Sequence, residues 1–233
     1  TAAVVADLDK DGRLDVAVAD SGADRVAILL GRAGGGLSPA GGCAVGDFPA
    51  AIAAADLDGD GRVDLVTANQ GSNDISILHG DGNGAFAETA RIAAPGTPSG
   101  VCVGDCDRDE VPDIVVSSAS SSLIRVFLGA PGSPWTFKYV IEAPAGEAPR
   151  GVLLADLDGN GYLDIVTAGT RSGEITVLHG RAEGYGAAIG VSVGGCPYAA
   201  AVADFTQDGL LDIACADRDL DSLILVRGAG PRP

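Results

Sequence analysis

The sequence of 233 residues has no methionine, two histidines, one tryptophan and an aromatic content of 4%. It also has no run of about 20 apolar residues, so we expect no membrane-spanning helix and no membrane insertion. No signal peptide is recognisable, and the chain begins at Thr1 within a strand-like run. We therefore expect a segment of a longer precursor.

Cysteine and histidine are too few and too scattered for the common zinc or catalytic sites. The five cysteines form no Cys-x-x-Cys pair, and their odd number does not indicate a full disulfide framework. We expect Cys102 and Cys106 to be small core residues. His79 and His179 are expected to be rim residues at strand ends rather than a shared zinc site. The serine run 117–122 has no base nearby in the sequence, so no catalytic residue is predicted.

Positive charge is also scarce. Fifteen lysine and arginine residues stand against 32 aspartate and glutamate residues, a formal net charge of −17. A surface this acidic repels phosphate backbones and anionic lipids, so nucleic acid is not an expected partner. More than half of the acids fall in one recurring motif. The rest of the composition, with 46% hydrophobic residues and 35 glycines, is typical of short packed strands joined by tight turns.

The recurring motif places oxygen-bearing side chains at offsets 0, 2, 4 and 8 of a short loop, usually with glycine at offset 5. Alternate carboxylates on a turning loop point towards one centre, and glycine permits a positive φ. The backbone carbonyl at offset 6 can join them. Ca²⁺ takes about six to eight hard oxygen ligands, whereas Mg²⁺ prefers a smaller octahedral site and keeps its waters. The motif therefore predicts calcium as the cofactor, in up to five sites.

The predicted metal ligands act through their side chains, except at offset 6, where the backbone carbonyl acts. They are Asp7, Asp9, Asp11, Arg13 and Asp15 in loop one; Asp56, Asp58, Asp60, Arg62 and Asp64 in loop two; Asp105, Asp107, Asp109, Val111 and Asp113 in loop three; Asp156, Asp158, Asn160, Tyr162 and Asp164 in loop four; and Asp204, Thr206, Asp208, Leu210 and Asp212 in loop five. An EF-hand is excluded, because position twelve is never glutamate and a strand-like run, not a helix, follows each loop.

The loops begin at residues 7, 56, 105, 156 and 204, which gives a period of 48–51 residues and indicates a propeller or solenoid. A proline lies seven residues before each loop where that position exists, and a glycine lies 24 residues after its first residue. The prolines are Pro49, Pro98, Pro149 and Pro197, and the glycines, called marker glycines below, are Gly31, Gly80, Gly129, Gly180 and Gly228. Length varies only between a marker glycine and the next proline.

Repeat two predicts strands at 50–55, 63–68, 74–79 and roughly 86–93. The first is continuously small and apolar, which suits the crowded centre of a radial arrangement. Four antiparallel strands per repeat predict an all-β fold, a β-propeller of five four-stranded blades. A parallel β-helix has shorter coils and is disfavoured.

We expect a single domain over residues 1–233. Its repeats span approximately 1–48, 49–97, 98–148, 149–196 and 197–233. The last repeat ends before its outer strand, and no extra strand precedes the first blade. Either five blades close into a ring or the chain is an arc of a larger propeller, and we expect the arc because propellers protect their strand edges.

The loop and the Asp-Leu-Val-type strand after it, as in residues 56–68, resemble the FG-GAP, or VCBS-type, repeats of integrin alpha-chain propellers and of secreted bacterial proteins. The resemblance covers essentially the whole chain. It implies a calcium ion in the hairpin between the first and second strands of each blade, on one face of the disc. It also implies ligands at loops on the opposite face or between blades.

The sequence departs from the family pattern at three places. Glu110 replaces the loop glycine, which predicts a strained or altered turn in loop three. Thr206 replaces a carboxylate in loop five, and Asn160 is a neutral oxygen donor in loop four. We therefore expect calcium in loops one, two and four, and weaker sites in loops three and five.

The resemblance implies a secreted protein, extracellular or on the cell surface. We expect a non-catalytic binding or adhesion module for a protein or carbohydrate ligand. Two alternatives stay open: a lectin with a carbohydrate site near Trp135, with Tyr139 nearby, and the propeller domain of a polysaccharide-active enzyme. Trp135 is otherwise expected to lie on a fourth strand and pack against the next blade.

Overall fold

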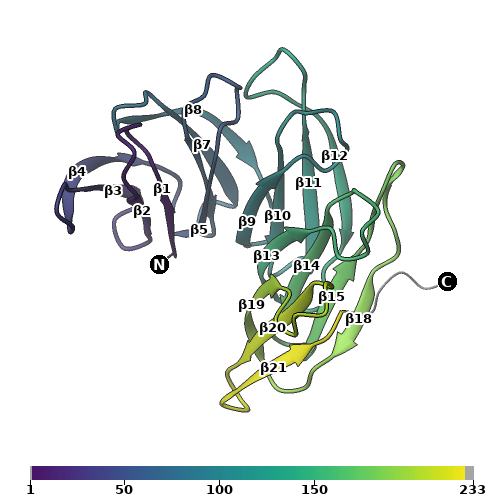
Figure 1. The fold of residues 1–233 in the computed structure, drawn as a ribbon. Coiled ribbons are helices and arrows are strands. Elements are labelled where there is room, and N and C mark those ends of the chain that lie inside the picture. Colours follow the sequence, from purple (N-terminus) through teal and green to yellow (C-terminus); the bar gives the residue numbers. More distant parts are fainter. Residues whose placement is uncertain (1, 229–233) are drawn as a thin grey trace.

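The computed structural model describes residues 2–228, and only the backbone of residues 138–140. The described residues form strands and turns without a helix, so none provides an apolar helix long enough to cross a membrane. Five antiparallel sheets of three or four strands, the blades, follow one another along an open arc, and a sixth sheet is a two-stranded hairpin (Figure 1).

The strands have the following bounds. Blade one contains β1 (Ala2–Ala6), β2 (Asp15–Asp20), β3 (Arg25–Gly31) and β4 (Leu37–Ala44). Blade two contains β5 (Pro49–Ala55), β6 (Asp64–Asn69), β7 (Asp74–Gly80) and β8 (Phe86–Ala93). Blade three contains β9 (Pro98–Gly104), β10 (Asp113–Ser118), β11 (Leu123–Gly129) and β12 (Phe137–Pro144). Blade four contains β13 (Pro149–Ala155), β14 (Asp164–Gly169), β15 (Glu174–Leu178) and β18 (Ile189–Ser192), with a small hairpin of β16 (Gly180–Arg181) and β17 (Gly184–Tyr185). Blade five contains β19 (Pro197–Ala203), β20 (Asp212–Asp217) and β21 (Ser222–Val226).

The strands of each blade pair in chain order as an antiparallel meander, and blade five has three of them within the described part of the chain. The first strands contact one another from blade to blade: β1 with β5, β5 with β9, β9 with β13, and β13 with β19. The five sheets do not close into a ring (Figure 1). The predicted all-β propeller of five blades is therefore confirmed, in the form of an arc whose last blade has three strands among residues 2–228.

Small residues on the first strands are required by crowding at the inner side of the arc. A Cβ atom on Gly100 of β9 would lie 2.7 Å from the Cα atom of Gly151 on β13. Real Cβ atoms do not approach another carbon that closely, so the two backbones can meet only without a side chain at this point. The close approach of β9 and β13 therefore requires glycine at this point of contact.

Adjacent blades share their hydrophobic cores. The second strands of blades two, three and four are buried along their whole length. In loops one to four the residue at offset 1 packs against the following blade: Leu8, Leu57 and Cys106 are only 1%, 8% and 5% exposed, and Leu157 is partly buried. Phe205, the equivalent residue of blade five, is 47% exposed. Blade five has no following blade in the described chain, so its offset 1 residue is not covered.

Two expectations about single residues have different outcomes. Cys106 is buried and Cys102 packs at the edge of the same cluster, as predicted, and all five cysteines are free. Trp135 lies in the turn before β12, not on the fourth strand, and packs against the core shared by blades two and three. The expectation of packing against the next blade is wrong, because this segment turns back, with a φ of 64° at Trp135, towards blade two.

We expect Leu57→Ala to lower the free energy of unfolding by about 2–5 kcal/mol, because a buried leucine leaves a cavity between blades two and three. Phe205→Ala, at the equivalent position of blade five, is the matched control and should cost roughly 1 kcal/mol or less. Urea unfolding followed by circular dichroism measures both. Equal losses would contradict the inference that adjacent blades stabilise each other through this position.

Candidate metal centres

Each loop joins the first strand of a blade to its second strand, and the aspartate at offset 0 organises the turn. In all five loops its Oδ1 atom accepts a hydrogen bond from the backbone N–H at offset 4, at 3.0–3.2 Å. Its Oδ2 atom accepts one from the N–H at offset 5, at 2.8–3.0 Å. Hydrogen bonds within the protein therefore give five loops one common conformation.

This conformation needs two residues with positive φ. At offset 5, four loops have glycine, with φ of 79–87°, and loop three has Glu110, with φ of 66°. The predicted effect of Glu110 is therefore strain rather than a changed shape, since a non-glycine residue takes the left-handed conformation within the same hydrogen-bond pattern. At offset 3, φ is also positive in all five loops, although Lys10, Arg108 and Gln207 occupy it in three of them. Glycine at offset 3 of loops two and four was the only sign of this in the sequence.

The aspartate at offset 8 is fully buried in every blade and ties the loop to two strands. Its Oδ1 atom accepts a hydrogen bond from the N–H of the marker glycine, at 2.7–2.9 Å. In loops one to four its Oδ2 atom accepts one from the N–H at offset 1, also at 2.7–2.9 Å. In loop five the donor is the N–H of Thr206, at 3.0 Å. The five carboxylates, each without exposed surface, are those of Asp15, Asp64, Asp113, Asp164 and Asp212.

The marker glycines are explained by the same contact. A Cβ atom on Gly80 would lie 2.1 Å from the carbonyl oxygen of Val63, at offset 7 of loop two. In the other four blades the equivalent distance is 2.5–2.7 Å. A side chain here would force the third strand away from the loop and break the hydrogen bond to the buried aspartate.

The carboxylates at offsets 0, 2 and 8 come together in loops one to three. One oxygen atom from each lies within 4.8 Å of the others in three groups: Asp7, Asp9 and Asp15; Asp56, Asp58 and Asp64; and Asp105, Asp107 and Asp113. In loop four the corresponding group is Asp158, Asp164 and His179. Within the described residues, loop five has no group of three, because Thr206 stands at offset 2. Loop three thus gathers as many acids as loops one and two.

The side chain at offset 4 has a second role. In every loop one of its oxygen atoms accepts a hydrogen bond from the N–H at offset 6, at 2.7–3.0 Å. Asp11 and Asp60 also form ion pairs with Arg13 and Arg62, which partly neutralise them. Asn160 donates from its amide to the carbonyl oxygen of the marker glycine, at 3.0 Å. Ligation by the offset 6 carbonyls of Arg13, Arg62, Val111, Tyr162 and Leu210 stays a prediction.

Burial, with repulsion from neighbouring acids, raises the pKa values of two of the buried aspartates. The pKa of Asp113 is raised to about 6, first by burial and then by the charges of Asp107 and Asp109, although two backbone hydrogen bonds lower it. Burial also raises the pKa of Asp64, and the charge of Asp58 adds to that effect. A divalent cation among these oxygen atoms would offset both the desolvation and the repulsion. The donors are hard oxygens, so the loops suit Ca²⁺.

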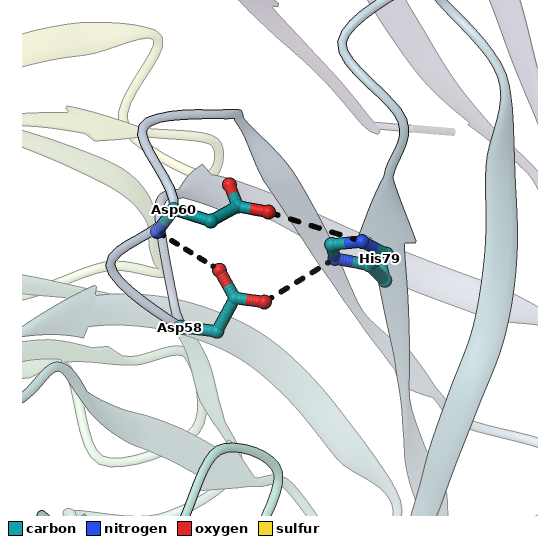
Figure 2. A group of neighbouring side chains, drawn as sticks. All are labelled: Asp58, Asp60 and His79. Carbon is teal, nitrogen blue, oxygen red and sulfur yellow. Dashed lines mark hydrogen bonds and ion pairs between the residues drawn. The ribbon is translucent and has the colours of Figure 1, made fainter. Parts of the chain in front are cut away.

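The two histidines were expected to be simple rim residues, but both side chains lie against acid loops. The Nδ1 atom of His79 is 3.2 Å from Oδ1 of Asp64 and 3.5 Å from Oδ2 of Asp58, and its Nε2 atom is 3.9 Å from Asp60. Figure 2 shows the imidazole facing Asp58 and Asp60 across the loop. His179 has the same place in blade four. The sequence signal was present, since both histidines directly precede a marker glycine, but its meaning required the hydrogen bond between that glycine and the loop.

A cavity of about 220 Å³ lies between loop two and blade three. Its lining includes Asp58, Glu110 and Trp135. The ring of Trp135 meets the ring of His79 edge-on, with centroids 5.5 Å apart. The side chain of Tyr139, expected near Trp135, lies outside the described residues.

Comparison with known sequences gives one family. Residues 7–67, 56–116, 105–167 and 156–215 each match the family described as FG-GAP-like repeat, so the matches together run from residue 7 to residue 215. No protein with a curated function matches the sequence.

Several solved structures are similar to this chain at low sequence identity. BBS1N, in complex with ARL6DN, has a TM-score of 0.65 and 17% identity, over 92% of this chain and 61% of that one. The periplasmic gluconolactonase PpgL of Pseudomonas aeruginosa has a TM-score of 0.65 and 18% identity, over 97% and 56%. A putative 6-phosphogluconolactonase of Bacteroides uniformis has a TM-score of 0.63 and 15% identity, over 100% and 72%. At these identities the likeness shows the fold alone, and this chain spans 61% of the BBS1N chain.

We expect Asp64→Ala to destabilise the metal-free protein by about 2–5 kcal/mol, because the N–H groups of Leu57 and Gly80 would be buried without an acceptor. Asp60→Ala, in the same loop, is the control and should cost about 1 kcal/mol or less, because it removes only partly exposed contacts. Both are measured by chemical unfolding in EDTA. If the two variants lose equal stability, the offset 8 carboxylate has no special structural role.

Proposed function

The chain belongs to the FG-GAP-like repeat family, and from this premise we propose that it is a calcium-binding β-propeller. In this proposal it is secreted, and acts outside the cell or on its surface as a non-catalytic binding or adhesion module for a protein or carbohydrate. The observation that carries calcium binding is the repetition of one loop geometry in which carboxylates at offsets 0, 2 and 8 converge.

Three features of the loops support calcium. The converging donors are carboxylate oxygens, and the offset 6 carbonyl would add a further hard donor. Burial and neighbouring acids raise the pKa values of Asp64 and Asp113, and a cation bound beside these carboxylates would offset both effects. The loop is already held by backbone hydrogen bonds, so little ordering is needed when the ion binds. The bound ion would supply a fixed positive centre at the turn between two strands.

An extracellular location is consistent with the chemistry of these sites. Extracellular calcium modules bind with dissociation constants of roughly 10⁻⁴–10⁻³ M, which suits millimolar calcium outside the cell. The net charge of −17 also favours a divalent cation and disfavours nucleic acid. The binding function itself follows from the family resemblance and from the use of the acids in metal loops rather than in a catalytic group.

We expect millimolar calcium to raise the melting temperature relative to EDTA. An ion that binds only the folded state stabilises it by RT ln(1 + [L]/Kd), about 1.4 kcal/mol per site at tenfold excess over Kd. Asp58→Asn should remove part of the rise, because it takes one charge from the group in loop two and keeps the side-chain size. Asp81→Asn, an acid of the β7–β8 turn outside that group, is the matched control and should leave the rise unchanged.

Differential scanning calorimetry and calcium titration by calorimetry measure these effects. Identical melting curves in calcium and EDTA, together with no heat of calcium binding, would overturn the calcium proposal. Asp58→Asn and Asp81→Asn could instead reduce the calcium-dependent rise in melting temperature by the same amount. That result would mean that calcium acts through general screening of the acidic surface.

A carbohydrate ligand is a second candidate function, favoured by the cavity beside Trp135. An aromatic ring next to polar lining residues can hold a sugar ring by its apolar face while carboxylates bind hydroxyl groups. Asp58 and Glu110 supply such carboxylates in this cavity. The site would be single, because the chain has one tryptophan.

We expect the native chain to bind glycans on an array in the presence of calcium, and we expect Trp135→Ala to abolish this binding. Tyr198→Ala is the control, because Tyr198 is an exposed aromatic residue of blade five, and this variant should still bind. The same preparations are tested for polysaccharide degradation and for lactone hydrolysis. No glycan binding by the native chain would remove the lectin candidate and leave a protein ligand. Turnover that depends on a residue of this chain would contradict the non-catalytic proposal.

A further inference from the structure

We propose that loops two and four are mixed nitrogen–oxygen metal sites, in which the imidazoles of His79 and His179 ligate a divalent transition metal such as Zn²⁺. The inference rests on the proposed cation binding by the loops, and it divides the five loops into two chemical kinds. Loops one, three and five offer oxygen ligands only.

The histidines are not needed by the fold. They stand directly before the marker glycine, where the other three repeats have Leu30, Leu128 and Arg227. The marker glycine of every blade nevertheless donates to the buried aspartate at offset 8, whichever side chain precedes it. A side chain at this position is therefore free to vary, and in two blades it is an imidazole placed over the acid loop.

The geometry in blade two suits a shared metal ion. The Nδ1 atom of His79 lies 3.2 Å from Oδ1 of Asp64 and 3.5 Å from Oδ2 of Asp58. Two ligand atoms about 2.1 Å from a tetrahedral zinc ion lie roughly 3.4 Å apart. The imidazole thus lies at the separation of a neighbouring ligand from each of these carboxylates, and one ligand atom each of Asp58, Asp60 and His79 lies within 4.8 Å of the others. Figure 2 shows His79 turned towards the loop rather than away from it.

Blade four repeats this arrangement independently. The Nδ1 atom of His179 lies 3.1 Å from Oδ2 of Asp164 and 3.6 Å from Oδ2 of Asp158. Both histidine side chains are 30% exposed, so an ion and a water ligand can reach them. An imidazole therefore gathers with two acids in both blades: with Asp58 and Asp60 in blade two, and with Asp158 and Asp164 in blade four.

Donor chemistry separates these two loops from the others. Ca²⁺ is a hard cation that takes oxygen ligands, and an imidazole nitrogen adds little to its binding. Imidazole suits Zn²⁺, Cu²⁺ and Ni²⁺, and open zinc sites combine three protein ligands from imidazole, carboxylate or thiolate with a water. Loops two and four should therefore retain a transition metal in the presence of excess calcium, whereas loops one, three and five should not.

A simpler role for the imidazole is donation of a hydrogen bond to the aspartate at offset 8. Glutamine can replace that donor but cannot replace the imidazole nitrogen as a strong ligand. His79→Gln and His179→Gln therefore distinguish ligation from hydrogen bonding. Each variant is also the matched control of the other, because the two histidines lie in different blades.

The chain contains a reporter for loop two. Trp135 is the single tryptophan, and its ring centroid is 5.5 Å from that of His79. An open-shell ion such as Co²⁺ bound beside His79 would quench the emission of this tryptophan at short range. Zn²⁺ has a filled d shell and would not quench by this mechanism. Loop four has no tryptophan, so emission reports on loop two alone.

The test is a Co²⁺ titration of the chelator-stripped full chain in millimolar calcium, followed by tryptophan emission, with calorimetry to count sites. We expect saturable quenching in the native chain and in His179→Gln, reversed by Zn²⁺. In His79→Gln the apparent affinity should fall about tenfold or more. Calorimetry should give two Co²⁺ ions per native chain, one per single variant and none in the double variant. X-ray absorption of the zinc-loaded native chain should show imidazole scattering that the double variant lacks.

Equal Co²⁺ affinity in the native chain and His79→Gln would overturn this inference, and so would equal loss of quenching in both single variants. The same measurements distinguish failure of the histidine ligation from failure of the calcium proposal. If calcium still raises the melting temperature of the double variant while its Co²⁺ affinity equals that of the native chain, only the histidine ligation is wrong. If no cation binds, both are wrong. Melting in EDTA shows whether each variant is folded before metal is added.

Discussion

The buried carboxylate at offset 8 is the interaction on which each blade depends. It accepts hydrogen bonds from two backbone N–H groups, and these bonds join the loop to the third strand. The marker glycine that donates one of them cannot be replaced by a larger residue, because there is no room for a side chain. Burying a carboxylate is costly unless hydrogen bonds and a cation offset the desolvation. The raised pKa of Asp113 indicates that two hydrogen bonds do not offset it fully. The fold therefore creates a demand for positive charge at the place where the other acids of the loop converge.

Dependence between blades comes from a different source. The first strands of blades three and four meet without a side chain at Gly100 and Gly151, and the offset 1 residues of loops one to three fill the space between one blade and the next. At the end of the arc this arrangement leaves apolar side chains uncovered, as Phe205 on the loop and Leu223 and Leu225 on β21 show. The hydrogen bonds of the offset 8 aspartate thus lie within one blade. The apolar side chains on the face of that blade stay exposed to solvent until another blade covers them.

Much of the fold was predictable because the repeat supplied five copies of one pattern. Strands predicted at 63–68 and 74–79 are observed as β6 and β7, within one residue at each end. The approach of His79 to loop two was not predictable, because it depends on contacts between residues far apart in the sequence. The positive φ at offset 3 was also missed, since lysine, arginine and glutamine there are not typical of left-handed backbone. Strand pattern is local and periodic, whereas these features arise from tertiary contact.

The hydrogen bonds also bear on how a metal would act. Both oxygen atoms of Asp64 already accept a backbone N–H, so each keeps only one lone pair for an ion or for His79. The loop is therefore formed before the ion binds, unlike small zinc domains that fold only with metal. Affinity would then come from charge and donor type rather than from the ordering of the chain. Loops with the same backbone geometry can therefore prefer different metals. The side chain directly before the marker glycine would decide which metal each loop prefers.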